Sequence, residues 1–316
     1  MKGLIVCAGK GTRLHPFTLS YPKTLLPVAN VPLLKYGIEK LAEAEIREIG
    51  IVMNTSQEKM IYETVGYGEH WGVRLSYIYQ NEPKGIADAV KQAESFVKDS
   101  PFLLLLGDNL ISESLADLKA GIERQGNSAS VMLAAVKNPQ DYGIAEVREN
   151  TLVSLQEKPR HPKSNLAVLG VYAFDSVIFH AVDAILPSPR GELEITDAIQ
   201  WLIDNGYKVT CNYAAKPIID VGTIERWLEA NRCMLDQKYK TGFFGERCLL
   251  SNTFIIPPVV IGPGSEIKNC IVGPYVSVGT NVELEGCRIS NCIFLENAKL
   301  LNSPSPVKDL IIGPQG

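Results

Sequence analysis

Apolar and polar positions alternate with two different periods along roughly the first 240 residues of this chain. Short apolar runs of the kind that form buried strands recur, and segments of helical period lie between them. One segment places Ile86 and Val90 on a single helical face, and another does the same with Ile195 and Ile199. This alternation predicts an α/β fold with a Rossmann-like, mostly parallel sheet and helices on both of its faces. The predicted strands are Leu4–Cys7, Ile51–Met53, Arg74–Tyr79, Phe102–Leu106, Ser130–Val136, Ala167–Phe174 and Lys208–Tyr213.

The pattern changes after Gly242. Aliphatic and aromatic residues then recur every five or six positions, with Gly-Pro, Gly-Thr or Asn between them, as in IGPGSE and VGTNVE. Hexapeptide repeats of this kind predict a small parallel β-helix, in which each short strand is one side of a triangular coil. We therefore predict two domains, residues 1–240 and 241–316. The side chains predicted to point into the coil are Ile261, Ile267, Val272, Val278, Leu284, Ile289, Phe294 and Leu300, together with Cys270, Cys287 and Cys292.

The composition excludes several classes of partner. The chain has 31 Lys and Arg against 35 Asp and Glu, a net charge of -4, so no broad basic surface indicates binding to nucleic acid or to an anionic membrane. Apolar runs such as residues 102–106 are far too short to span a bilayer, and the N-terminus lacks a signal-peptide pattern. Seven scattered cysteines form no Cys-x-x-Cys pair, which argues against a disulfide framework and a zinc site. We expect a cytoplasmic protein and, from its strand-rich tail and broad α/β faces, a homo-oligomer.

A glycine-rich turn follows the first predicted strand in the segment CAGKGTRLHPFT. A dinucleotide site of the Rossmann type requires a third glycine, but Leu14 stands in its place, and the phosphate loop of ATPases requires Gly-Lys-Ser/Thr where this chain has Gly-Thr-Arg. The segment nevertheless has parts that a triphosphate needs. Gly9 and Gly11 allow close approach of the backbone, the amides near Thr12 can face phosphate oxygens, and Arg13 offers a fork of donors. A plain strand-to-helix turn would show the same two glycines.

Three further residues could hold the phosphates or a metal. Lys23 follows Pro22 in a polar loop and adds a compact charge that could reach an α-phosphate. Asp108 ends an apolar strand in LLGDN, and Asp220 ends a short apolar segment in IIDVG. Aspartates at the carboxyl ends of sheet strands can converge on the crevice where open α/β sheets bind ligands, and Mg²⁺ prefers such oxygen ligands. The alternative interpretation of Asp108 is a helix cap or turn residue.

Together these segments resemble the sugar-1-phosphate nucleotidylyltransferases. The supporting blocks, which run in family order from residue 3 to about residue 225, are CAGKGTRLHPFT, PKTLLPVANVPLLKYGIE, YQNEPKGIADAV, LLLLGDN, DYGIAEV, LQEKP, GELEITDAIQWLIDNG and IIDVGT. The resemblance is greatest to the glucose-1-phosphate thymidylyltransferases of the longer form, which end in a left-handed β-helix. It implies a Mg²⁺-dependent enzyme that converts dTTP and glucose 1-phosphate to dTDP-glucose and pyrophosphate.

The resemblance also implies roles for particular residues. Asp88 departs from the pattern, because it stands where family members often carry Gln or His. The implied catalytic residues are Arg13, Lys23 and Asp108. The implied nucleotide contacts are Ala8, Gly9, Gly11, Thr12, Arg13, Gln80 and Gly85. The implied sugar-phosphate contacts are Tyr142, Gly143, Glu157, Lys158 and Glu194, and the implied metal ligands are Asp108 and Asp220.

Sequence alone leaves other interpretations of these residues. A surface turn around Pro83 accounts for Gln80 and Gly85, and an exposed hairpin with an ordinary ion pair accounts for Glu157 and Lys158. The same chemistry with UTP or another hexose 1-phosphate remains an alternative function. A non-catalytic sensor of sugar nucleotides on the same fold is another, although such a sensor could lose its metal ligands without losing the fold.

Overall fold

The computed structural model describes residues 1–7, 9, 11–19 and 21–314. The chain forms two compact units, Met1–Lys10 with Leu34–Ile218 (unit 1) and Gly11–Leu33 with Ile219–Gly316 (unit 2). The segment that follows the first strand therefore groups with the C-terminal part of the chain. The predicted domain division between residues 240 and 241 follows the change of sequence pattern and stays a prediction.

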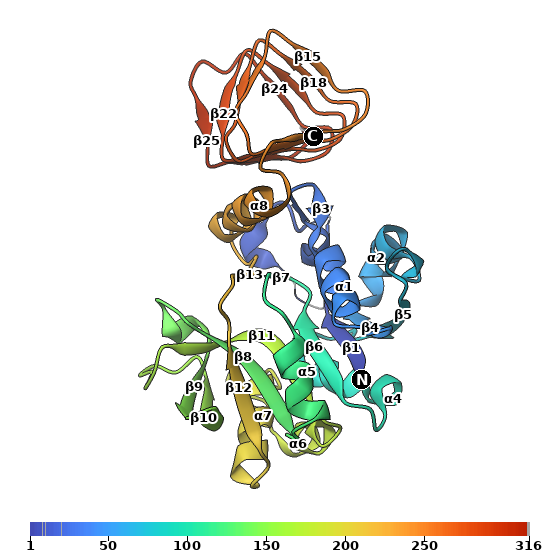
Figure 1. Cartoon of the computed structure of the whole chain (residues 1–316), viewed down its shortest axis with the longest axis vertical. Coiled ribbons are helices and arrows are strands. Elements are labelled where there is room, and N and C mark those ends of the chain that lie inside the picture. Colours follow the sequence, from blue (N-terminus) through green and yellow to red (C-terminus); the bar gives the residue numbers. More distant parts are fainter. Residues whose placement is uncertain (8, 10, 20, 315–316) are drawn as a thin grey trace. The chain divides into compact units, whose positions relative to one another are not determined.

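In the described part of unit 1, nine strands form one sheet in the order β5-β4-β1-β6-β11-β8-β12-β10-β9 (Figure 1). The pairs β5–β4, β4–β1, β1–β6 and β8–β12 are parallel, which confirms the predicted α/β class with a parallel core. Strands β11, β10 and β9 pair antiparallel to their neighbours, and the β9–β10 hairpin was not among the predicted strands. The strands are β1 (Lys2–Val6), β4 (Glu48–Met53), β5 (Arg74–Tyr79), β6 (Phe102–Leu106), β8 (Ala129–Ala135), β9 (Gly143–Arg148), β10 (Thr151–Glu157), β11 (Leu166–Phe174) and β12 (Val209–Tyr213), with the short β7 (Asn109–Ile111) after β6.

Helices cover both faces of this sheet because its central strands, such as β1 and β6, are apolar on both sides. Gly3 of β1 faces Leu41 of α1, whereas Gly50 of β4 faces Phe96 of α4 on the opposite side. Helix α5 packs on β8, β11 and β12, and α7 packs on β10 and β12. The helices are α1 (Leu33–Glu43), α2 (Glu58–Val65), α3 (Ile86–Gln92), α4 (Glu94–Val97), α5 (Ala116–Glu123), α6 (Ile178–Ala184) and α7 (Ile195–Asp204), with 3-10 turns at Thr55–Gln57, Glu69–Trp71 and Pro139–Asp141.

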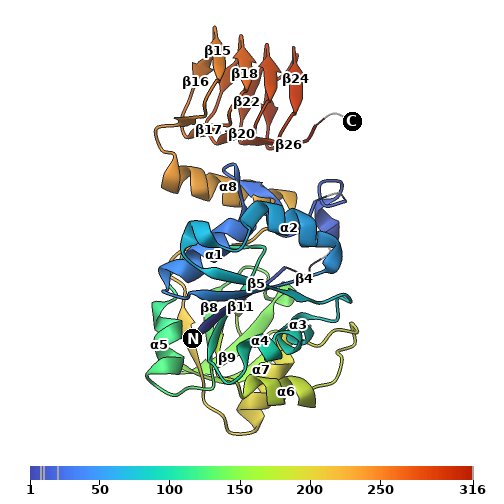
Figure 2. The ribbon, with the colours of Figure 1, turned by 90° about the vertical axis from the view of Figure 1, so that its right-hand side faces the viewer.

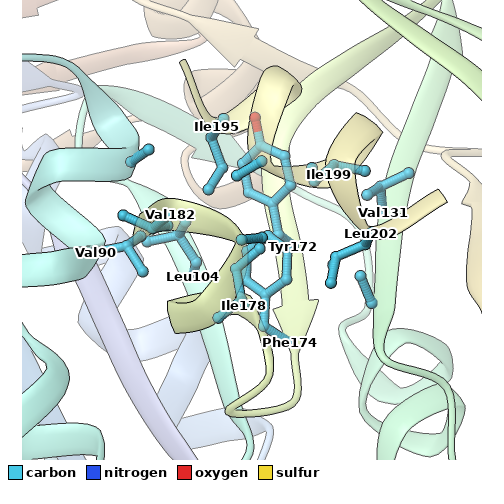
Figure 3. Close-up of a cluster of buried hydrophobic side chains, with 14 of the residues drawn as sticks. Val90, Leu104, Val131, Tyr172, Phe174, Ile178, Val182, Ile195, Ile199 and Leu202 are labelled. Atoms are coloured by element: carbon cyan, nitrogen blue, oxygen red, sulfur yellow. The ribbon is translucent and has the colours of Figure 1, made fainter. Parts of the chain in front are cut away.

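An extensive apolar cluster of unit 1 lies between the sheet and helices α3, α6 and α7. Figure 3 shows Tyr172 and Phe174 of β11 beside Ile178 of α6 and the α7 residues Ile199 and Leu202. All five are at most 3% exposed. Since burial of apolar area is the main favourable term in folding, this cluster fixes the strand ends that carry the polar residues described below.

Unit 2 combines a loop, one long helix and the β-helix. The loop contains 3-10 turns at Thr12–Leu14 and Lys23–Leu25 and a hairpin of β2 (Pro27–Val28) and β3 (Val31–Pro32). Strand β13 (Ile218–Asp220) leads into α8 (Ile224–Lys238), whose first turn is capped by the Thr223 hydroxyl, which accepts a hydrogen bond from the Arg226 amide.

The C-terminal strands wind into a coil of triangular cross-section (Figures 1 and 2). In the described residues its faces are the parallel sheets β14-β17-β20-β23-β26, β15-β18-β21-β24 and β16-β19-β22-β25. This confirms the predicted β-helix. The strands are β14 (Phe243–Phe244), β15 (Leu249–Ser251), β16 (Phe254–Ile255), β17 (Val259–Ile261), β18 (Glu266–Lys268), β19 (Ile271–Val272), β20 (Val276–Val278), β21 (Glu283–Glu285), β22 (Arg288–Ser290), β23 (Cys292–Phe294), β24 (Lys299–Leu301), β25 (Val307–Lys308) and β26 (Ile311–Ile312).

The interior of the coil contains the side chains that the repeat predicts. Seven of the eight predicted aliphatic or aromatic residues are at most 2% exposed, and the eighth, Leu300, is partly buried against the same cluster. Cys270, Cys287 and Cys292 also lie inside, where their thiols donate to backbone carbonyls two residues earlier. Burial raises the pKa of the Cys270 and Cys292 thiols, so both stay protonated and act as small apolar residues.

Candidate active site

The loop that follows β1 brings both predicted cations of unit 2 close to Asp220. Lys23 is 9% exposed, and its Nζ lies 3.2 Å from Asp220 Oδ1. A Cβ on Gly222 would lie 3.1 Å from both Arg13 Nη2 and Asp220 Oδ2, so guanidinium and carboxylate border the same space. The structure thus assembles two cations and one carboxylate from segments about 200 residues apart in the sequence.

The backbone of this loop forms a tight turn that begins at Gly11. Gly11 has a φ of 63°, and its carbonyl accepts hydrogen bonds from the Leu14 amide and from the Thr18 hydroxyl. A Cβ at Gly11 would lie 3.2 Å from Lys23 Cβ, so the start of the loop passes directly beside the lysine. Thr12 and Arg13 are exposed, and the predicted contact Gly9, in unit 1, is exposed too. The predicted contact Ala8 lies outside the described residues.

Asp108 lies in unit 1 between β6 and β7, on a backbone fixed from both sides. The Gly107 amide donates to the Val6 carbonyl at 2.9 Å, and the buried Asn109 donates its Nδ2 to the Leu169 carbonyl at 2.8 Å. Asn109 was not predicted as a site residue. A register shift in the β8–β11 pairing near Leu169 explains why that carbonyl is available to a side chain.

Gln80 of unit 1 is held with its amide in one orientation. The residue is 4% exposed, and its Nε2 donates to the Gly85 carbonyl at 3.0 Å and to Asp88 Oδ2 at 2.6 Å. An ionised carboxylate only accepts hydrogen bonds, so the Asp88 carboxylate requires the amide nitrogen to face it. The two hydrogens of Nε2 are thus engaged, and Oε1, an acceptor, is the part of the amide that can contact a ligand.

Gly85 connects this predicted base-binding segment to the predicted sugar-binding segment. Its φ of 106° and the backbone of Leu193, which a Cβ would strike, both require glycine at this position. On either side of Gly85, the Leu193 amide donates to Lys84 O at 2.7 Å and the Ala87 amide donates to Leu193 O at 3.1 Å. Since Glu194 directly follows Leu193, these bonds bring the two predicted sets of residues together within unit 1.

The predicted sugar-side residues converge around two carboxylates. Glu157 ends β10, and Glu194, which is 5% exposed, precedes α7. Gly143, directly opposite Glu157 in the β9–β10 ladder, has no space for a Cβ, because it would lie 2.6 Å from Thr196 Cγ2. Thr196 in turn donates its hydroxyl to Glu157 Oε2 at 3.1 Å. Tyr142 and Lys158 flank the same hairpin, where the Lys158 amide donates to the Tyr142 carbonyl.

Arg190 is the main residue of this cluster that sequence reasoning missed. Its Nη2 lies 2.8 Å from Glu194 Oε1 and 3.4 Å from Glu157 Oε1. Ser188 also donates to Glu194, at 2.8 Å. Arg190 stands four residues before Glu194 in PSPRGELE, a loop whose Pro, Ser and Gly content gives no sign of a buried ion pair.

The environment of Glu157 changes its acidity. Burial, first, and the negative charge of Glu194, second, raise the pKa of the Glu157 carboxyl above its ordinary value of 4.5. Lys158, Thr196 and Arg190 oppose this shift, with Lys158 Nζ 3.8 Å from Glu157 Oε1. Two carboxylates that share one cation are suited to accept hydrogen bonds from neighbouring hydroxyl groups of a sugar.

Trp227 is fully buried in α8, where its ring packs edge-on against that of Phe17. Within residues 1–7, 9, 11–19 and 21–314, no three His, Cys, Asp or Glu side chains gather where they could hold a metal ion. None of the helices in this described part of the chain is long and apolar enough to cross a bilayer. The predicted homo-oligomer stays a prediction.

Comparisons with known proteins establish the family. The family model for nucleotidyl transferases matches residues 2–237. A low-salt glycan biosynthesis nucleotidyltransferase of Haloferax volcanii is 38% identical over 99% of this chain and 92% of its own length, and a glucose-1-phosphate thymidylyltransferase of Streptomyces griseus is 37% identical over 95% and 88%. A Bacillus anthracis structure described as a glucose-1-phosphate thymidylyltransferase, solved with sucrose, has 33% identity and a TM-score of 0.70 over 77% of this chain and 97% of its own.

The chain therefore belongs to the nucleotidyl transferase family. The predicted resemblance is confirmed at this level. The family model covers all of unit 1 except Met1, and the Streptomyces relative, which is a glucose-1-phosphate thymidylyltransferase, is matched over nearly the whole chain. The protein is a sugar-1-phosphate nucleotidyltransferase.

Proposed function

We propose that this enzyme transfers a thymidylyl group from dTTP to glucose 1-phosphate, giving dTDP-glucose and pyrophosphate. The observation that carries the proposal is the cluster of Lys23, Arg13 and Asp220, which places two cations and a carboxylate around the space beside Gly222. Such a cluster suits a polyanion that arrives with a divalent cation. Similarity to the Streptomyces thymidylyltransferase supports the choice of substrates, whereas the Haloferax relative carries no substrate in its name.

The chemistry needs no general base. A phosphate monoester has its second pKa near ~6, so glucose 1-phosphate is mostly dianionic at neutral pH and can attack the α-phosphorus directly. A bond forms between a sugar-phosphate oxygen and the α-phosphorus, and the bond to the β-phosphate breaks, so that pyrophosphate leaves with its electron pair. Lys23 and Arg13 hold the triphosphate in line and offset the charge that builds on the bridging and leaving oxygens.

The residues fit magnesium. Asp108 and Asp220 supply carboxylate oxygens, and Mg²⁺ usually takes one or two carboxylates from a protein and its other ligands from phosphates and water. Gly222 keeps the space beside Asp220 Oδ2 open, where a side chain would intrude. When bound, the ion would lower the repulsion between the two phosphorylated substrates. We propose Asp108 and Asp220 as its protein ligands.

The fixed amide of Gln80 supports a pyrimidine with a hydrogen on N3. Thymine and uracil donate from N3, which complements Gln80 Oε1, whereas cytosine has an acceptor there. The Asp88 carboxylate enforces this orientation of the Gln80 amide. The aspartate that departs from the family pattern at residue 88 therefore favours binding of thymine or uracil over cytosine. Uracil presents the same N3 donor as thymine, so both dTTP and UTP fit this orientation of the Gln80 amide.

We expect Asp88→Asn to weaken the discrimination between dTTP and dCTP about tenfold, because an asparagine can accept or donate and no longer forces one orientation of the Gln80 amide. The measurement is kcat/KM for both triphosphates. Gln92→Met is the matched control, since Gln92 Nε2 also bonds Asp88, at 3.4 Å, but through Oδ1 rather than through the Oδ2 that Gln80 uses. Equal selectivity in the parent and in Asp88→Asn would contradict this role for Asp88.

On the sugar side we propose that Glu157 and Glu194 accept hydrogen bonds from hydroxyl groups, that Lys158 binds the phosphate, and that Gly143 leaves room for the ring. We expect KM for glucose 1-phosphate to rise about tenfold on acidification, starting at a higher pH than an ordinary glutamate would require. The sign follows from the raised pKa of Glu157, because protonation then begins earlier as the pH falls and removes the acceptor.

Glu157→Gln provides the control for this pH dependence. The substrate phosphate also titrates near pH ~6, but its contribution remains in the glutamine variant. Only the difference between the two KM profiles reports on residue 157. Parallel profiles for parent and variant would show that Glu157 does not bind the sugar in its ionised form.

Pyrophosphate release across a panel of triphosphates and sugar 1-phosphates, with and without Mg²⁺, tests the proposed function. We expect the highest kcat/KM for dTTP with glucose 1-phosphate and no turnover without a divalent ion. A higher value for UTP or for another hexose 1-phosphate would assign that alternative pair. Binding of nucleotide without product from any pair would instead indicate a sensor.

A further inference from the structure

One face of the β-helix is covered within unit 2, and the repeat pattern does not predict it. Val260, Ser277 and Ile293 stand in register in the middle of neighbouring strands β17, β20 and β23. Their side chains point out of the coil, because the alternate residues on both sides form its interior cluster. All three are nevertheless at most 3% exposed. Helix α8 lies along this face in both ribbon views (Figures 1 and 2).

A buried asparagine of α8 joins this face to the loop that carries Arg13 and Lys23. Asn231 is fully buried, and its Oδ1 accepts hydrogen bonds from the Ser277 hydroxyl and from the Ala29 amide, both at 2.8 Å. Its Nδ2 is buried without a hydrogen-bond partner. An unpaired buried donor is costly, so the position retains an asparagine for its acceptor oxygen.

The group that Asn231 holds is the tip of the β2–β3 hairpin. Ala29 and Asn30 have φ of 47° and 63°, the two left-handed residues of a tight hairpin turn. Alanine is strained in this conformation, and a hairpin with two residues per strand is not stable alone. It is held from outside, since Asn30 Nδ2 donates to Val278 O of the β-helix at 2.6 Å and Trp227 Nε1 of α8 donates to Pro27 O at 2.6 Å.

The hairpin leads directly back to Lys23. The Leu26 amide donates to the Lys23 carbonyl at 3.1 Å, and the Leu25 amide donates to the Pro22 carbonyl at 2.9 Å. Leu25 and Leu26 are at most 2% exposed. Thr24, the other residue between the lysine and the hairpin, is 3% exposed, so a shift of the hairpin would move Lys23 through a buried segment.

We propose that the β-helix positions the triphosphate-binding loop, and that Asn231 and Ser277 are the positioning residues that transmit this constraint through the β2–β3 hairpin to Lys23. The inference rests on the proposed function of Lys23 as a triphosphate ligand. It assigns the C-terminal repeats a role in the reaction although they supply none of the proposed substrate contacts.

The test compares Asn231→Leu, which keeps the volume but removes the acceptor, with the milder Ser277→Ala. We expect Asn231→Leu to lower kcat/KM for the triphosphate at least about tenfold, while KM for the sugar phosphate changes less than about twofold, because the sugar-side residues belong to unit 1. Ser277→Ala is expected to change the same parameter in the same direction by a smaller factor. Arg232→Met is the matched control, since Arg232 bonds Asn291 of the β-helix at 3.1 Å from the next position of α8.

Two further measurements distinguish a specific effect on the position of Lys23 from a general loss of packing between α8 and the β-helix. Hydrogen–deuterium exchange is expected to rise in residues 23–33 of Asn231→Leu, and not in Arg232→Met. In a Lys23→Met background, Asn231→Leu is expected to lower triphosphate affinity by less than about twofold, because its effect passes through the lysine. Full additivity of the two changes, or equal losses in Asn231→Leu and Arg232→Met, would overturn the proposal.

The exchange measurement needs no substrate, so it tests the proposed anchor, the contacts of Asn231 with Ser277 and the β2–β3 hairpin, independently of the reaction. If no substrate pair releases pyrophosphate while exchange in residues 23–33 still rises selectively, the proposed function fails and the anchor stands. If turnover follows the proposed function but exchange and kinetics of Asn231→Leu and Ser277→Ala equal those of the parent, the anchor fails alone.

Discussion

Lys23→Met is expected to lower kcat/KM for the triphosphate about 10³-fold, the upper range for loss of one electrostatic group in a transition state. Lys23 is nearly buried, and its Nζ faces Asp220 at 3.2 Å, so its charge acts in surroundings that water screens poorly. Methionine keeps the length and the apolar stem but not the charge. Steady-state pyrophosphate release at several triphosphate concentrations gives both kcat and KM.

Lys59→Met is the matched control for this change, because the Lys59 side chain is 86% exposed on α2 and pairs only loosely with Glu63, at 3.9 Å. We expect it to leave kcat/KM within about twofold of the parent. Thermal unfolding of both variants checks that neither loses the fold. Lys23→Met with kcat/KM within about threefold of the parent would show that Lys23 does not bind the triphosphate.

The fold could be predicted well wherever one local pattern decides it. Inward positions of the β-helix follow from spacing alone, because each coil repeats the same strand and turn. The helical face of Ile86 and Val90 was also predicted, and in the structure this helix, α3, ends before Ala93, after which the short α4 begins. The β9–β10 hairpin was missed as a pair of strands, because the outer residues of this edge are polar and the apolar period of its strands is short.

In the candidate site, too, residues that belong to a local motif could be predicted, whereas residues that depend on distant partners could not. The loop glycines, Arg13, Lys23 and the aspartates lie in short motifs that the sequence displays directly. Asn109 and Asn231 act through partners far away in the chain, Leu169 and Ser277, and Arg190 joins its near neighbour Glu194 to the more distant Glu157. No property of the single residue indicates such a partner, so the supporting residues of a site become visible only once the fold brings the segments together.

Asp108→Asn is expected to lower kcat at least ~10²-fold and to raise the Mg²⁺ concentration needed for half-maximal rate. Asparagine preserves size and one oxygen but removes the negative charge that a hard divalent cation requires. The bonds donated by the Gly107 amide and by the Asn109 side chain do not involve the Asp108 carboxylate, so they remain in the variant and hold the strand end in place. The measurement is a Mg²⁺ titration of the rate at saturating substrates.

A change of the Mg²⁺ requirement distinguishes a metal ligand from a residue that only caps a turn. Asp117→Asn, on the exposed side of α5, carries the same change of charge and is expected to keep both kcat and the Mg²⁺ midpoint within about twofold of the parent. If Asp108 only caps a turn, its asparagine variant keeps the thermal stability, kcat and Mg²⁺ midpoint of the parent, since asparagine caps about as well as aspartate. If Asp108 binds the ion, the fold stays equally stable but the rate falls, and added Mg²⁺ restores it only in part.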